Sequence, residues 1–143
     1  MNDHNETGKS VAERLAALAA RDAWLNSLGV SLVHAAVDRV TIEMTVAEQH
    51  MNFNGTCHGG VMFSLADTAF GLASNARGVI AAAVHADIAF CAPVGVGDRL
   101  TAEAIEVSRS RRVGTYRVDV KSAGRLVATF TGTVHVTERP HAA

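Results

Sequence analysis

The fold of this 143-residue chain is decided by residues 59–76, GGVMFSLADTAFGLASNA. At helical spacing the apolar side chains of this segment point in almost every direction around the axis, and a single charged residue, Asp67, interrupts them. A helix that is apolar all round must be enclosed by the rest of the protein. The segment therefore predicts a long central helix, enclosed on all sides and ended by Gly78.

Alternation of apolar and polar residues predicts strands on both sides of this helix. Residues 40–46 alternate and are expected to pair with residues 31–36 in a hairpin. After the helix, strands are predicted over 80–90, 100–108, 116–120 and 126–136, with a bulge near Ala104 and Ile105. The first of these strands is expected to place six residues on one face: Ile80, Ala82, Val84, Ala86, Ile88 and Phe90.

No helix separates the late strands, so the sheet is predicted to be mostly antiparallel and curved around the central helix, an α+β arrangement. Before it, a capping box at Ser10–Glu13 and leucines at helical spacing predict one amphipathic N-terminal helix, which Gly29 ends. With 48% hydrophobic residues the chain can bury one core and is too short for two. We expect a single domain over 1–143, with its core at about 24–136.

The composition of the chain argues against some classes of binding partner and predicts a cellular compartment. With 13 Lys+Arg against 14 Asp+Glu, the chain has no basic field for nucleic acid or an anionic membrane, and charges interrupt the apolar stretch 59–97 before it reaches spanning length. The first ten residues are polar and have no apolar leader core, so we expect a cytoplasmic protein with Cys57 and Cys91 reduced. Neither cysteine nor the seven histidines show metal-ligand spacing, and no metal site is expected.

The candidate chemistry lies on the central helix. A carboxylate such as Asp67 in an apolar setting costs several kcal/mol unless it is paired or its pKa rises, so it is either functional or held in a structural contact. Gly59 and Gly60 open the helix, where unpaired N–H groups at the positive end of its dipole can meet a substrate oxygen; the alternative is close packing of the helix start. Asp67 lies eight positions after Gly59. That spacing is a rise of roughly 12 Å, so a single carbonyl reaches both only if a second copy lies antiparallel across a two-fold axis.

The segment Asn52–Phe70, NFNGTCHGGVMFSLADTAF, closely resembles the signature of the hotdog-fold acyl-CoA thioesterases, and within them the phenylacetate-degradation subfamily, PaaI. The likeness of layout extends from about Trp24 to Val136. The resemblance implies a hotdog fold and hydrolysis of an acyl-CoA, with (hydroxy)phenylacetyl-CoA or another aryl or medium acyl-CoA as substrate. It also implies a homo-oligomer, a dimer with shared active sites and then a dimer of dimers, and no cofactor beyond the coenzyme A of the substrate.

The resemblance assigns roles to residues of this segment. It implies that Asp67 acts as nucleophile or as general base for water and that the Gly59 N–H polarises the thioester carbonyl. Asn52 would orient water or the carboxylate, with Asn54 as the weaker rival for that role. His58 would brace the helix start rather than transfer protons. His58 and its neighbour Gly60 are also expected to contact the substrate.

Two features outside the segment bear on the same chemistry. Arginines gather in Ser108–Arg112, and the guanidinium groups of Arg111 and Arg112 suit the nucleotide phosphates of coenzyme A; a solvated turn is the alternative. Many relatives place a Thr or Ser on the strand after the helix, but the run Ala83–Asp87 has none. His85 or Asp87 would have to substitute, unless they lie at an interface or in solvent.

Two other functions remain open for a chain of this layout. One is an acyl-CoA hydratase or dehydratase of the same fold, which uses a histidine with an acid; the context of Asp67 fits a thioesterase better. The other is a non-catalytic acyl-CoA-binding module, which gains little from a carboxylate beside the thioester.

Overall fold

The computed structural model describes residues 9–142, so the polar N-terminal stretch on which the compartment prediction rests lies almost entirely outside the described residues. Helices and strands follow along the chain in this order: α1 (Val11–Arg21), α2 (Ala23–Leu28), β1 (Ser31–Ala35), β2 (Arg39–Thr45), the short 3-10 helix η1 (Glu48–His50), α3 (Gly59–Ser74), β3 (Val79–Phe90), β4 (Arg99–Arg109), β5 (Val113–Ser122) and β6 (Arg125–Pro140).

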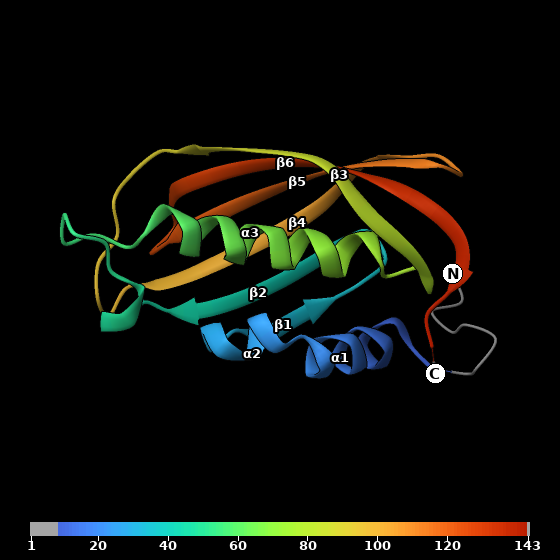
Figure 1. The fold of residues 1–143 in the computed structure, drawn as a ribbon, viewed down its shortest axis with the longest axis horizontal. Helices are drawn as coiled ribbons and strands as arrows, with labels where there is room; N and C mark the ends of the chain where they lie inside the picture. Colours follow the sequence, from blue (N-terminus) through green and yellow to red (C-terminus); the bar gives the residue numbers. More distant parts are fainter. Residues whose placement is uncertain (1–8, 143) are drawn as a thin grey trace.

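The six strands form one antiparallel sheet in the order β1-β2-β4-β5-β6-β3. Figure 1 shows α3 lying across one face of this curved sheet, with α1 and α2 beside it on the side of β1. The predicted α+β arrangement, including the hairpin before the helix and the antiparallel strands after it, is confirmed. Within residues 9–142 no helix combines the length and hydrophobicity needed to cross a bilayer.

Aromatic packing fixes α3 against the sheet. The Phe70 ring lies 5.9 Å from the Tyr116 ring and 5.5 Å from the Phe130 ring, centroid to centroid. It also lies so close to Gly132 of β6 that a Cβ atom there would come within 2.6 Å of it. Only glycine leaves room for this contact, so Gly132 sets how closely α3 approaches the sheet.

The N-terminal region forms two helices, and the prediction of one continuous helix is wrong. Asp22 separates them: its backbone is extended, with ψ 100°, and its carboxylate accepts a hydrogen bond from the Leu25 N–H at 3.0 Å. Aspartate is among the best N-cap residues, and this bond begins a new helix in a new direction. The predicted ends are confirmed, because Ser10 accepts from the Glu13 N–H at 3.1 Å and Gly29 ends α2 with φ 73°.

Strand β3 does not keep six alternating residues on one face as predicted. Ala83 pairs with the buried Val134, but the pairing register then shifts, and Ala86 pairs with Gly132. Directly opposed residues share a face, so Ala83 and Ala86 both lie on the face of the sheet that carries Val134 and Gly132, although three positions separate them. The extra residue is Val84, which is 66% exposed. This bulge puts Ile80 and Ala82 on the opposite face from Ala86, Ile88 and Phe90.

The bulge predicted in β4 lies further along than expected. Pairing with β2 and β5 is regular through Ala104, which is buried, and Ile105, which is 37% exposed. The register shifts at Val107 instead. The two successive apolar residues are therefore not a bulge. Ala104 lies in the core and Ile105 lies at the surface, and single apolar residues are common on protein surfaces.

Candidate active site

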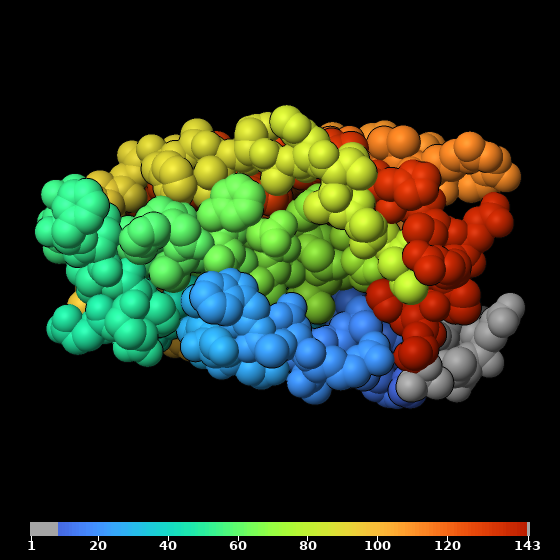
Figure 2. Space-filling model, viewed as in Figure 1, coloured from blue at the N-terminus to red at the C-terminus, as the bar shows by residue number. Residues whose placement is uncertain are grey.

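One stripe of α3 reaches the surface of the single chain. Gly60 and Asp67 are exposed, and Ser64 and Gly71 between and beyond them are half-buried. Figure 2 shows α3 (green) uncovered between the N-terminal helices (blue) and β3 (yellow-green). The prediction of a helix enclosed on every side is therefore wrong along this stripe, and Asp67 does not lie in a fully apolar enclosure.

Asp67 borders a hollow of about 410 Å³ between the N-terminal helices and α3. Among its lining residues are Leu18, Asp22 and Trp24 from the α1–α2 region and Asp67, Gly71 and Leu72 from α3. No group within residues 9–142 donates a hydrogen bond to the Asp67 carboxylate, which is thus open to a ligand or to water. Partial burial raises the pKa of Asp67 above its ordinary value, and the negative charge of Asp22 raises it further.

The start of α3 presents one free backbone donor. His58 is the N-cap, and its Nδ1 accepts a hydrogen bond from the Gly60 N–H at 2.8 Å. The Gly59 N–H has no acceptor in the part of the chain that the structure describes, so it can donate to a substrate carbonyl and polarise it. The Gly60 N–H cannot do so, because it already donates to His58 Nδ1. The Phe90 ring lies where a Cβ on Gly59 would come within 3.1 Å of it.

Cys57 precedes this helix start but does not supply a nucleophile. Its side chain is buried, and its Sγ lies 3.8 Å from the His58 carbonyl oxygen. Burial raises the pKa of the Cys57 thiol, which therefore stays protonated at neutral pH.

Asn52 orders the loop that leads into α3. Its Oδ1 accepts hydrogen bonds from the Asn54 N–H at 2.9 Å and the Thr56 N–H at 3.1 Å, and its Nδ2 donates to Thr56 Oγ1 at 3.1 Å. An amide nitrogen carries two hydrogens, so one of them is left for another partner. Asn54 contributes a backbone N–H to this loop, and its side chain is exposed.

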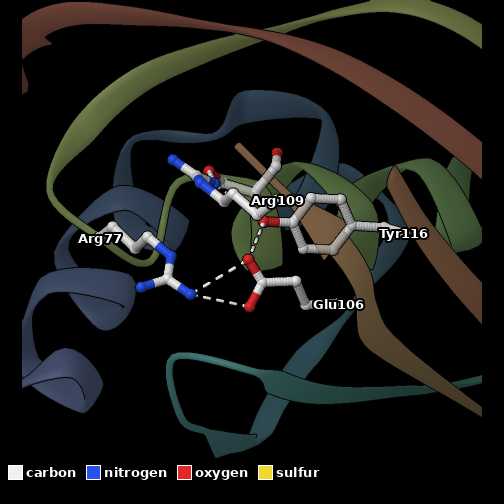
Figure 3. Close-up of polar contacts among 5 residues, drawn as sticks. Arg77, Glu106, Arg109 and Tyr116 are labelled. Carbon is white, nitrogen blue, oxygen red and sulfur yellow. Dashed lines mark hydrogen bonds and ion pairs between the residues drawn. The ribbon is translucent and has the colours of Figure 1, made fainter. Parts of the chain in front are cut away.

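The three arginines of the β4–β5 hairpin divide into two kinds. Arg109 donates from Nη1 to the Ser74 carbonyl oxygen, at the last turn of α3, and to Tyr116 Oη, both at 2.8 Å. Figure 3 shows this contact together with the ion pair of Arg77 and Glu106, whose closest oxygen and nitrogen are 2.8 Å apart. Arg109 therefore has a structural role, which is to anchor the C-terminal end of α3.

Arg111 and Arg112 are exposed at the tip of the same hairpin. The hairpin (orange) lies at one end of the molecule and the loop before α3 (teal) at the other, as Figures 1 and 2 show. The sequence-predicted residues therefore fall at three places along the molecule: Asn52, His58, Gly59 and Gly60 at one end, Asp67 in the middle, and the arginines at the other end.

His85 and Asp87 do not replace the missing hydroxyl within this chain. They pair with Thr133 and Thr131 on the face of the sheet opposite to the buried Gly132. Their side chains are 70% exposed, and their nearest nitrogen and oxygen are 3.6 Å apart. Both residues thus point away from α3 and Asp67.

Sequence reasoning missed the residues that share the hollow with Asp67. Asp22 carried a usable signal, since an aspartate three residues before Leu25 is a strong N-cap pattern. Trp24 and Gly71 carried none, because their role depends on how α2 packs against α3. Within residues 9–142 no three or more His, Cys, Asp or Glu side chains are grouped to hold a metal ion.

Comparison with known proteins agrees with this geometry. Residues 54–129 match the family model described as the thioesterase superfamily. The chain is 37% identical to the acyl-coenzyme A thioesterase PaaI of Escherichia coli strain K12, over 80% of this chain and 82% of that one. The solved structure of E. coli PaaI superposes with a TM-score of 0.89 at 33% identity, covering 91% of this chain and 95% of that one.

Two further relatives are more partial matches. One, from Archaeoglobus fulgidus, is 44% identical over 66% of this chain; the match spans only 62% of that relative's length. The other is the structure of smu.793 from Streptococcus mutans UA159 bound to acetyl CoA, with a TM-score of 0.75 and 26% identity, covering 78% of this chain and 91% of that one.

The chain belongs to the thioesterase superfamily. It has the hotdog fold of that family and is a thioester hydrolase similar to PaaI, as the resemblance of the Asn52–Phe70 segment implied.

Proposed function

We propose that this protein hydrolyses the thioester of an aryl or medium-chain acyl-CoA, releasing the free acid and coenzyme A. The observation that carries the proposal is that one helix bears two unused groups: within residues 9–142, the Asp67 carboxylate has no hydrogen-bond donor and the Gly59 N–H has no acceptor. The relatives support the substrate class, since one is named for acyl-coenzyme A and another was solved with acetyl CoA bound.

A second copy of the chain completes the site in this proposal. Gly59 and Asp67 are about 12 Å apart along one helix, too far to act on a single carbonyl. Two copies of α3 that run antiparallel about a two-fold axis set Gly59 of each chain beside Asp67 of the other. The open stripe on α3 and the outer edge of β3, a strand that pairs only with β6 among the described residues, both leave surface for such a partner.

The reaction then follows from these groups. The Gly59 N–H of one chain donates to the thioester oxygen and stabilises the oxyanion that forms on it. Asp67 of the other chain either attacks the carbonyl carbon or takes a proton from the water that attacks. When the oxyanion collapses, the C–S bond breaks, coenzyme A leaves as the thiolate and is protonated, and the acid is released.

The remaining predicted residues take supporting roles. In this proposal the second Nδ2 hydrogen of Asn52, in the loop before α3, is donated to the attacking water or to the partner carboxylate. Because antiparallel helices reverse the two ends, the hairpin with Arg111 and Arg112 comes to the end at which the partner's α3 begins. Exposed guanidinium groups there suit the phosphates of coenzyme A.

The finer assignments rest on the likeness to PaaI. We propose (hydroxy)phenylacetyl-CoA as the substrate, in the breakdown of phenylacetate or related aromatic compounds in the cytoplasm. We further propose that two dimers associate into a homotetramer.

A screen of thiol release tests the function. Purified protein is given acetyl-CoA, octanoyl-CoA, phenylacetyl-CoA and crotonyl-CoA, and free thiol is measured alongside loss of the crotonyl double bond. We expect thiol release that is fastest with the aryl or medium acyl groups and absent with Asp67→Asn. Hydration of crotonyl-CoA without thiol release would instead show a hydratase, and tight binding of all four without reaction would show a binding module.

A further inference from the structure

The size and the lining residues of the hollow beside Asp67 limit which molecules can bind in it. We propose that it holds the acyl group of the substrate, and that Trp24 and Gly71 select a neutral aryl group over acetyl and over acyl groups that carry a carboxylate. This inference rests on the proposed thioesterase function, because it takes the thioester carbon to lie at Asp67.

The size of the hollow fits an acyl group rather than a whole acyl-CoA. Its volume is about 410 Å³. Small-molecule pockets range from about 300 to 1,000 Å³, and an apolar cavity of about 150 Å³ holds benzene. A phenylacetyl group therefore fits with Asp67 at its carbonyl end, and the coenzyme must lie outside the hollow.

Gly71 lies near the C-terminal end of α3, and no contact among the described residues requires a glycine there. A Cβ added there would meet no atom within 4 Å, in contrast to Gly132, where a Cβ would be crowded by Phe70. Glycine inside a helix costs about 1 kcal/mol relative to alanine. The space above Gly71 belongs to the hollow, so an absent side chain at this position serves an occupant of the hollow and not the packing of this chain.

Trp24 supplies a flat apolar wall on the other side. It lies in the first turn of α2, two residues after the Asp22 N-cap, and 59% of it is exposed. Leu18 and Leu72 line the hollow with it. An aryl ring between these side chains would stack on the indole, an interaction worth more than its buried area alone, while an acetyl group would reach none of them.

The polar groups of the hollow are mostly satisfied already. Asn75 uses its Oδ1 for the Ala81 N–H at 2.9 Å and its Nδ2 for the Gly71 carbonyl at 2.8 Å, and Thr68 Oγ1 donates to the Ser64 carbonyl at 2.7 Å. Among the described residues that line the hollow, only Asp22 and Asp67 carry a charge. A carboxylate on the acyl group would be repelled by both, so a neutral acyl group is required.

Variants at Trp24 and Gly71 test this selection. We compare kcat/KM for phenylacetyl-CoA, acetyl-CoA and succinyl-CoA in the wild type and in Trp24→Ala, Trp24→Phe and Gly71→Leu. Trp24→Ala and Gly71→Leu are expected to lower kcat/KM for phenylacetyl-CoA by about 10-fold or more, as a lost or filled apolar contact does, and to change it for acetyl-CoA by less than about threefold. Trp24→Phe is expected to keep most of the wild-type preference.

Val33→Ala is the matched control, because Val33 is also an exposed apolar residue but does not line the hollow. Circular dichroism and size-exclusion chromatography accompany each variant. Loss of phenylacetyl-CoA and acetyl-CoA turnover by the same factor in well-folded Trp24→Ala overturns the inference, as does a wild type that prefers succinyl-CoA. A Gly71→Leu protein that dissociates would assign the space above Gly71 to a partner helix and overturn its role in selection. If the wild type hydrolyses none of the three, the proposed function itself fails.

Discussion

Asp22, between α1 and α2, and Asp67, on α3, line the same hollow, and the negative charge of Asp22 adds to partial burial in raising the pKa of Asp67. Asp22 is at the same time the N-cap of α2, where its Oδ1 accepts from the Leu25 N–H. The break between the N-terminal helices thus places a second carboxylate beside the proposed catalytic one. Its charge and its capping bond can be separated by mutation.

Asp22→Asn is expected to move the acidic limb of the pH profile of kcat/KM to lower pH. Asparagine caps a helix as well as aspartate does, so α2 should stay intact, but the charge that raises the pKa of Asp67 is gone. The activity of Asp67 requires its ionised form, and a lower pKa keeps that form to lower pH. An acidic limb that does not move in a folded Asp22→Asn protein would show that the limb reports a group other than Asp67.

Asp67→Asn is expected to lower kcat by about 10² to 10⁴-fold, the usual range for loss of a positioned acid–base group, without loss of folding. Turnover near the wild-type rate in a folded variant would remove Asp67 from the mechanism.

The same variant has a pH-dependent effect on stability with a definite sign. Since the pKa of Asp67 is higher in the folded state, the folded state binds more protons between the two pKa values, and wild-type stability falls as the pH rises through that window. The variant lacks this loss, so at neutral pH its Tm should equal or slightly exceed that of the wild type. Below about pH 4 the gain should vanish. A variant that is less stable than the wild type at neutral pH would contradict the raised pKa.

Replacing Arg111 and Arg112 by Ala is expected to raise KM for a CoA thioester about 10-fold while changing KM little for the corresponding pantetheine thioester, which lacks the nucleotide phosphates. The effect should shrink at high salt, because both arginines are exposed. Arg117→Ala, an exposed arginine on β5 outside the hairpin, is the control. An equal rise in KM for both substrates would rule out a nucleotide clamp.

His58→Ala is expected to destabilise the protein by about 1 kcal/mol, or about 3 °C in Tm, because the Gly60 N–H loses its cap. It should also lower kcat, since the helix start that presents the Gly59 N–H is loosened. His58→Asn, which can cap in the same way, should restore both values. A folded His58→Asn protein as slow as His58→Ala would show that the imidazole itself takes part in the reaction.

The central helix and the antiparallel sheet could be predicted from the sequence because their patterns are local. The run from Met62 to Phe70 is apolar on nearly every side, and only a helix inside a core accommodates that pattern. The same pattern did not predict the open stripe of α3, because Gly60, Ser64 and Gly71 are small residues that also occur in protein cores. Which side of a helix stays open depends on the assembled protein.

The β3 bulge at Val84 could not be predicted, because alanines and valines fit either face and the apparent alternation continues across it. The hollow was also beyond prediction: Trp24 and Gly71 are 47 positions apart, and they face one hollow only because Asp22 redirects the chain into α2. The candidate residues on α3 were found because the thioesterase signature is continuous in sequence. Their arrangement across two chains rests on helix geometry.

That arrangement is the central claim, and a mixed dimer tests it most directly. Asn52→Asp keeps the acceptor that orders the loop from 52 to 56 but removes the amide N–H, and Asp67→Asn removes the carboxylate. Each homodimer then carries two damaged sites. Co-refolded and confirmed as hybrid by mass spectrometry of tagged chains, the mixture should regain about a quarter of wild-type activity, because half the dimers are mixed and one of their two sites is intact. Activity equal to the average of the two parents would contradict a site shared between Asn52 of one chain and Asp67 of the other.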